Sequence, residues 1–175
     1  MNDPASPTFL GNEFLLWLWF VLETEVDTLT LGDGSDVVVM LARTLMLDCP
    51  RALSGNETIR SDGPTKLPES RRAIQSGKLP RQAGLILVRQ DQQYELTLQA
   101  ETLAVGGAKF PAPEERDERA RQAERVEQLR HLIETVDLLY DAFLGRRLEA
   151  GWSRELELMK SWLQRDEKAR LAATA

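Results

Sequence analysis

Few residues in this chain are of the types that carry out catalysis. The 175-residue sequence contains one cysteine, Cys49, and one histidine, His131. A cysteine nucleophile needs a nearby base, and nothing in the sequence pairs Cys49 with His131, which falls on a long predicted helix beside its apolar stripe. A disulfide framework, a multi-cysteine metal site and any site that needs two histidines are therefore excluded. We expect an inert cysteine, a surface histidine and no metal ligands.

The carboxylates and glycines match no familiar catalytic motif. Five acidic residues from Glu23 to Asp36 lack the twelve-residue pattern of an EF-hand, so we expect a solvated turn there. A restriction-type nuclease would carry Glu-x-Lys on a strand, to hold Mg²⁺ beside a cationic base, whereas residues 95–97 read Glu-Leu-Thr. The glycines form neither a Walker loop nor a dinucleotide fingerprint. We predict no catalytic residue, no cofactor and no small-molecule substrate.

Charge is distributed unevenly along the chain. The sequence has 22 Lys and Arg against 28 Asp and Glu, a net charge of −6. Residues 1–50 carry a net charge of −7, whereas residues 60–89 carry seven basic residues against two acidic ones, a net charge of +5. A basic surface can contact phosphates in a salt-dependent way. An ordinary solvated face would have the same composition, so both interpretations stay open at this point.

Composition and hydropathy indicate an ordinary folded chain. Hydrophobic residues make up 42% and charged residues 29% of the sequence, which excludes wholesale disorder and is enough for one structural unit. The longest apolar run, residues 14–22, is nine residues long, and a bilayer-spanning helix needs about 20. Acidic residues precede this run, unlike the positive start of a secretory signal. We expect a cytoplasmic protein that does not associate with a membrane.

The N-terminal part predicts a helix and a β-hairpin. Residues 9–23 are apolar nearly all round at helical spacing, with Thr8 as the predicted cap, so we expect a buried helix rich in aromatic side chains. Residues 28–31 and 36–41 alternate around a Gly/Asp turn, which is typical of a hairpin. The second strand, or a third one after a bend, continues over residues 44–47.

The middle of the chain predicts further strands and one short helix. Residues 54–68 are a loop with a short strand at 57–60, and Pro68 begins a helix over 69–76 that Gly77 ends. Two strands follow at 85–89 and 94–98, with a turn at 91–93. The alternation of the second strand indicates one solvated face. Residues 103–110 form another extended piece.

The C-terminal part predicts two helices, over 114–148 and 153–170, after a boundary at 111–113. The first carries an apolar stripe that includes Val126, Leu129 and Ile133, and its mixed charges suit either a solvated stem or a seam for a partner helix. The predicted fold is α+β: a buried N-terminal aromatic helix, an antiparallel sheet of about five strands with a short helix, and a C-terminal αα-hairpin. Residues 1–111 would form the helix and sheet, and residues 112–175 the hairpin packed on them as a single unit.

One apolar segment resembles a known family. Residues 9–20 read Phe-Leu-Gly-Asn-Glu-Phe-Leu-Leu-Trp-Leu-Trp-Phe, similar to the F-L-G-R-E-F-L-T-W-L-W segment of longer, divergent members of the recombination-associated RdgC family. The order of later features is similar too, from an Arg-rich short helix and two strands to a Gly-Ala-Lys-Phe-Pro stretch at 107–111. The resemblance covers most of this chain but only the C-terminal part of those relatives, and Asn12 stands in place of their arginine.

This resemblance implies a non-enzymatic protein that binds double-stranded DNA without sequence preference. The family is known for dimers that close into a ring on DNA and restrain recombinase filaments. Together with the basic segment, the resemblance makes Arg71, Arg72, Lys78 and Arg81 the predicted phosphate contacts, with double-stranded DNA and a second copy of the chain as partners. The alternative is a protein-interaction or structural module that docks a partner or itself through residues 114–148, without binding DNA.

Overall fold

A computed structural model describes residues 10–24, 27–48, 57–60 and 68–174. The helices are α1 (Gly11–Thr24), α2 (Pro68–Gln75), α3 (Glu118–Leu148) and α4 (Trp152–Thr174), and the strands are β1 (Thr28–Thr30), β2 (Asp36–Asp48), β3 (Glu57–Arg60), β4 (Leu79–Arg89), β5 (Gln92–Gln99) and β6 (Val105–Lys109). This is the predicted α+β fold, with an antiparallel sheet and a C-terminal helix pair. The predicted cap Thr8 lies outside the described residues.

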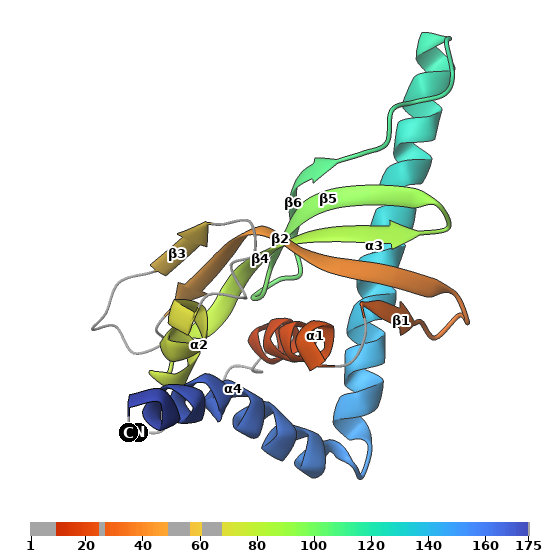
Figure 1. Cartoon of the computed structure of the whole chain (residues 1–175). Coiled ribbons are helices and arrows are strands. Elements are labelled where there is room, and N and C mark those ends of the chain that lie inside the picture. Colours follow the sequence, from red (N-terminus) through yellow and green to blue (C-terminus); the bar gives the residue numbers. More distant parts are fainter. Residues whose placement is uncertain (1–9, 25–26, 49–56, 61–67, 175) are drawn as a thin grey trace, which may run out of the picture.

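The strands form one antiparallel sheet in the order β1-β2-β4-β5-β6, and β3 pairs with the later part of β2 (Figure 1). Leu87 pairs with Val39 on one side and with Tyr94 on the other, so the side chains that share its face form one buried apolar layer. The register of β2 against β4 shifts between Leu41 and Leu45. Gly84 lies at this shift, where a Cβ atom would meet Ala42 Cβ at 3.2 Å and the Thr44 carbonyl oxygen at 3.3 Å.

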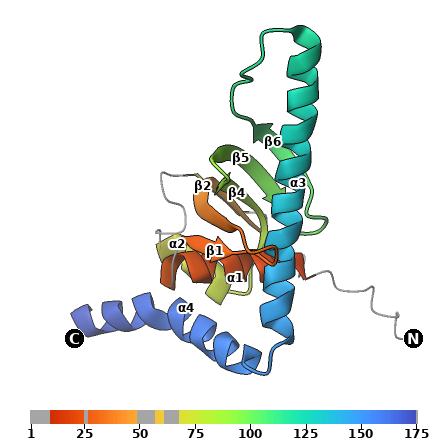
Figure 2. The same cartoon turned by 90° about the vertical axis from the view of Figure 1, so that its right-hand side faces the viewer.

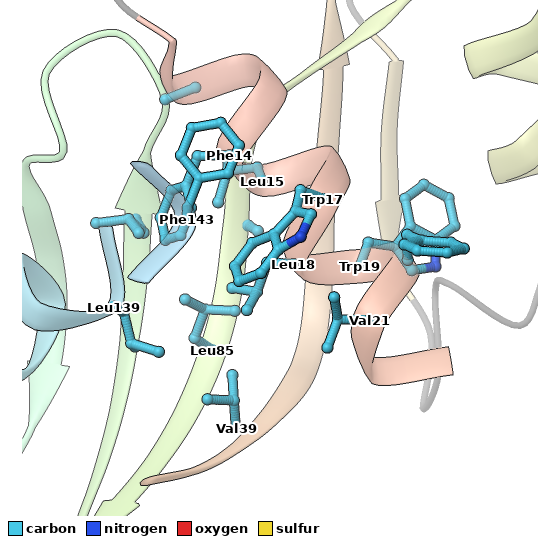
Figure 3. Packing of buried hydrophobic residues seen from close by; sticks show 14 of the residues in the cluster. Phe14, Leu15, Trp17, Leu18, Trp19, Val21, Val39, Leu85, Leu139 and Phe143 are labelled. Atoms are coloured by element: carbon cyan, nitrogen blue, oxygen red, sulfur yellow. The ribbon is translucent and has the colours of Figure 1, made fainter. Parts of the chain in front are cut away.

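Helix α1 forms the centre of the core. It lies against one face of the sheet, between α3 and α4 (Figures 1 and 2). Phe14 and Trp17 contact Phe143 of α3, with ring centroids 5.6 and 5.5 Å apart, and Figure 3 shows Leu18 and Val21 of α1 directed toward the strands. The helix is therefore buried on several sides, as its all-round hydrophobicity predicts. Asn12 donates to the Pro80 carbonyl at 2.6 Å and ties α1 to β4.

Helix α3 is longer than the sheet that it packs on. Its C-terminal half packs against α1, while its N-terminal end projects beyond the strands (Figures 1 and 2). The helix begins at Glu118 rather than at the predicted residue 114, because the Asp117 carboxylate accepts the N–H groups of Arg119 and Ala120, both at 3.0 Å. A cap of this kind satisfies backbone donors that have no partner within the helix.

The turn between β4 and β5 also differs from its predicted place. The two strands are longer than expected and meet at a two-residue turn, Gln90–Asp91, in which both residues have positive φ angles of 50° and 63°. This is the geometry that matches the twist of a hairpin. Gln-Asp lacks the glycine that marks most such turns, which is why the sequence pattern places the turn at residues 91–93 instead.

Among the described residues, no helix combines the length and the apolar composition that crossing a membrane requires.

Candidate functional site

The four predicted phosphate contacts differ in burial, and one of them is directed into the fold. Arg71, on α2, donates to the Glu23 carboxylate, and its guanidinium lies 5.3 Å from the centre of the Trp162 ring. Its side chain is only 16% exposed. Arg71 therefore holds α2 against α1 and α4, and its charge is directed into the fold.

The other three predicted contacts lie at or near the surface. Arg72 is exposed on α2, and Lys78 and Arg81 are partly buried just before and within β4. Arg81 borders a polar hollow of about 280 Å³ that is lined by Met46, Arg81, Gln82, Gln99 and Glu101. The carboxylate of Glu101 offsets part of the positive charge in this hollow.

Glu23 has a role that the sequence did not reveal. The sequence predicts it in a solvated acidic turn, but its carboxylate accepts hydrogen bonds from Trp19 Nε1 at 2.7 Å and from Trp162 Nε1 at 3.0 Å, besides the contact with Arg71. The expectation is wrong because Trp162 and Arg71, both distant in sequence, pack on this end of α1. Only the donors that surround Glu23 in space identify it.

Arg89 is a second basic residue of the 60–89 segment that is directed inward. It is 3% exposed, and it donates to Ser35 Oγ at 3.0 Å, Thr135 Oγ1 at 3.2 Å and Asp33 Oδ2 at 2.5 Å. Hydrogen bonds from Ser35, followed by the charge of Arg89, lower the pKa of Asp33. The contacts fasten α3 and the β1–β2 turn to the end of β4. The position follows from strand parity, since Leu85, Leu87 and Arg89 share the buried face.

His131 lies beside the contacts of Arg89. It is partly buried, whereas the sequence predicts a surface residue. Its Nδ1 atom is 2.9 Å from the Tyr94 hydroxyl, and its Nε2 atom is 3.2 Å from Gln90 Oε1. Burial, helped by the positive charge of Arg89 and opposed by Glu134, lowers the pKa of His131. Both ring nitrogens are occupied by neighbouring side chains, which suits an anchor between α3 and the sheet.

The same helix carries exposed apolar side chains on a neighbouring side. We define the α3 patch as Val126, Leu129 and Ile133, which are 56%, 44% and 47% exposed. They follow one another at three- and four-residue steps and therefore share one side of the helix. A shallow groove of about 520 Å³ runs along this side, lined by Val126, Leu129, Arg130, Ile133, Glu134, Asp137 and Leu138.

The apolar stripe predicted for α3 is therefore only partly core. Leu132, Leu139 and Phe143 are fully buried, whereas the α3 patch is open. The sequence favoured core packing for the whole stripe, because apolar spacing does not reveal which side another element covers. The sheet and α1 cover a narrower part of the helix surface than its apolar residues span.

Contacts at both ends hold the α3 patch in place. On the N-terminal side, Arg125 lies over Phe110 at 5.6 Å, and Glu124 accepts the Glu114 backbone N–H at 3.1 Å, so the preceding segment folds back along the helix. On the C-terminal side are the buried contacts of Leu139 and Phe143. The patch therefore lies on a helix that is held by contacts on both sides of the patch, rather than on a loop.

Within the described part of the chain, no three His, Cys, Asp or Glu side chains come together as metal ligands. No protein-family model, no curated protein and no solved structure matches the chain.

Proposed function

We propose that this chain is a non-enzymatic association module that docks another protein chain through the α3 patch. The observation that carries this proposal is the exposure of three adjacent branched apolar side chains on one side of a helix whose other side is anchored. Scattered apolar residues are normal on protein surfaces, but adjacent ones that form a groove are typical of interaction sites. Burying apolar surface is favourable by roughly 25 cal/mol per Å².

The rigidity of the helix supports this proposal. Binding costs less when the contact surface is already ordered. The polar contacts of Arg89 and His131 fix α3 next to the patch, since they involve Thr135 and His131 of the same helix segment. The three side chains of the α3 patch would therefore already be held in place before a partner binds.

Site-specific photo-crosslinking in cells tests the proposal. A photoreactive phenylalanine analogue replaces Val126 or Ile133 in the full chain, and Leu148, which is 84% exposed on the same helix, provides the matched control. We expect adducts to a second polypeptide from both patch positions and not from Leu148, and their loss when Leu129→Glu is added. Adducts of equal yield at Leu148, or none at the patch, would contradict docking at this surface.

We propose binding to double-stranded DNA, in the manner of an RdgC-like protein, as a second candidate function. What favours it is that Arg72 is exposed and Lys78 and Arg81 are partly exposed within one short stretch. These three residues, rather than Arg71, would then contact phosphates. We also propose a cytoplasmic location, which is the expectation from the sequence.

Fluorescence anisotropy on a short duplex, at about 50 mM salt and at moderate salt, tests the second candidate. The triple variant Arg72→Ala, Lys78→Ala, Arg81→Ala should weaken binding and lower the salt slope, by about 0.9 for every phosphate that the variant no longer neutralises. The control variant removes the same charge elsewhere, at the exposed residues Arg146, Arg154 and Lys160. No binding by the wild-type chain, or equal weakening in both variants, would contradict the predicted site.

A further inference from the structure

The charges around the α3 patch differ at its two ends. The line of residues that contains Val126 and Ile133 continues to Arg119, seven residues before Val126, and to Asp137, four residues after Ile133. These steps keep all four side chains on one side of the helix. Arg119 and Asp137 are exposed, and neither forms an ion pair within the described part of the chain. Within the described residues, the patch therefore has a positive charge without an ion pair at one end and a negative charge without an ion pair at the other.

We infer that the occupant of the α3 patch is a second copy of this chain, with its α3 antiparallel to the first; this rests on the proposed docking function. When Arg119 is level with Asp137 of the other copy, the midpoint of the pair falls at residue 128. Val126 of each copy then lies nearly level with Leu129 of the other. One alignment thus brings Val126 and Leu129 of the two copies together, places Ile133 level with Ala123, and pairs both sets of opposite charges.

The orientation follows from the same charges. A parallel pair would place Arg119 against Arg119 and Asp137 against Asp137, and like charges at close range are unfavourable. The antiparallel pair forms the contact between Arg119 and Asp137 twice, because a two-fold axis relates the copies.

The shape of the fold also permits this arrangement. The side chains of α3 that pack deepest into the core, Leu132, Leu139 and Phe143, all lie C-terminal to the midpoint. The N-terminal end of the helix projects beyond the sheet (Figure 1). In an antiparallel pair the two folded bodies therefore lie toward opposite ends, and each is next to the projecting helix end of the other copy.

Charge reversal tests both the occupant and the orientation. Sedimentation equilibrium at about 50 mM salt should show a reversible dimer of the wild-type chain, of low affinity because the patch is small. Arg119→Glu alone and Asp137→Arg alone each create two repulsive pairs, and each should raise the dissociation constant about tenfold or more. The double variant should regain the wild-type constant.

A mixture of the two single variants gives a sharper result. In an antiparallel dimer of one Arg119→Glu chain and one Asp137→Arg chain, both charge pairs have opposite signs, so the mixture should form a heterodimer more tightly than either variant forms a homodimer. Thermal unfolding checks that the substitutions leave the fold intact, as expected for two exposed residues without internal ion pairs.

The possible failures can be distinguished. A wild-type chain that stays monomeric at 1 mM, or dimers that respond equally to all the variants, would overturn this inference. Photo-crosslinked adducts of the α3 patch that have a mass other than twice that of the chain would overturn it as well, while the docking function would stand. Absence of patch adducts would refute both.

Discussion

Replacing Glu23 by glutamine should destabilise the fold far more than replacing an exposed glutamate. The Glu23 carboxylate accepts from two indole N–H groups and from Arg71, at a site where both charged side chains are 16% exposed. Glutamine keeps one oxygen acceptor but presents an N–H₂ group to a second donor, and it leaves the Arg71 charge uncompensated. Losing a buried charge-assisted hydrogen bond costs about 1.5–3 kcal/mol, and orphaning a buried donor costs about 1–3 kcal/mol.

Because the Arg71 side chain keeps some contact with water, values near the lower end of these ranges apply, and we expect a total loss of about 3 kcal/mol in the free energy of unfolding. Urea unfolding followed by tryptophan fluorescence measures this loss, since Trp19 and Trp162 are themselves the donors. The control is Glu157→Gln, whose carboxylate forms an exposed pair with Lys160 and should change the free energy by less than about 0.5 kcal/mol. A Glu23→Gln loss as small as that of the control would refute the role assigned to Glu23.

Three further results follow from the local geometry. His131 is the only histidine in the sequence, so its ring signal in a proton NMR titration is unambiguous. The midpoint of this titration, which reports the pKa of His131, should fall below 6.5. The free energy of unfolding should decrease as the pH falls below 6.5, because the unfolded chain then binds the proton more readily than the folded chain. A midpoint above 6.5 would show that the ring is not desolvated. Gly84→Ala should cost about 1–3 kcal/mol in thermal unfolding, because the new methyl group meets the Thr44 carbonyl oxygen at 3.3 Å, and an unchanged melting temperature would mean that the strands separate there at little cost. Asp117→Ala should cost about 1 kcal/mol through loss of the α3 cap, whereas Asp117→Asn should keep most of that stability.

The inward direction of Arg71 and Arg89 changes how the basic segment is interpreted. Counted along the chain, residues 60–89 carry a net charge of +5, but two of these charges neutralise Glu23 and Asp33 inside the fold. The positive charge available to a partner is therefore smaller than the sequence count. This is why the α3 patch, rather than the basic segment, carries the first proposal.

Local patterns are sufficient to predict most of the elements. The all-round apolar spacing of α1, the alternation of β5 and the Pro68 and Gly77 boundaries of α2 all depend on neighbours within a few residues, and they predict bounds close to the observed ones. The exceptions are also local: the cap at Asp117 and the turn at Gln90–Asp91 use residue types that are common in other settings.

The type and order of the helices and strands can thus be predicted from the sequence alone, because propensity and hydrophobic periodicity act over a few residues. The tertiary structure decided which charges are internal and which apolar residues are exposed. Arg71 and Arg72 are adjacent and chemically identical, yet only Arg71 meets a carboxylate from α1. Likewise, Leu129 and Leu132 are one helical turn apart, and only Leu132 is covered by the rest of the fold. Such differences depend on elements that are distant in sequence, so no local pattern contains them.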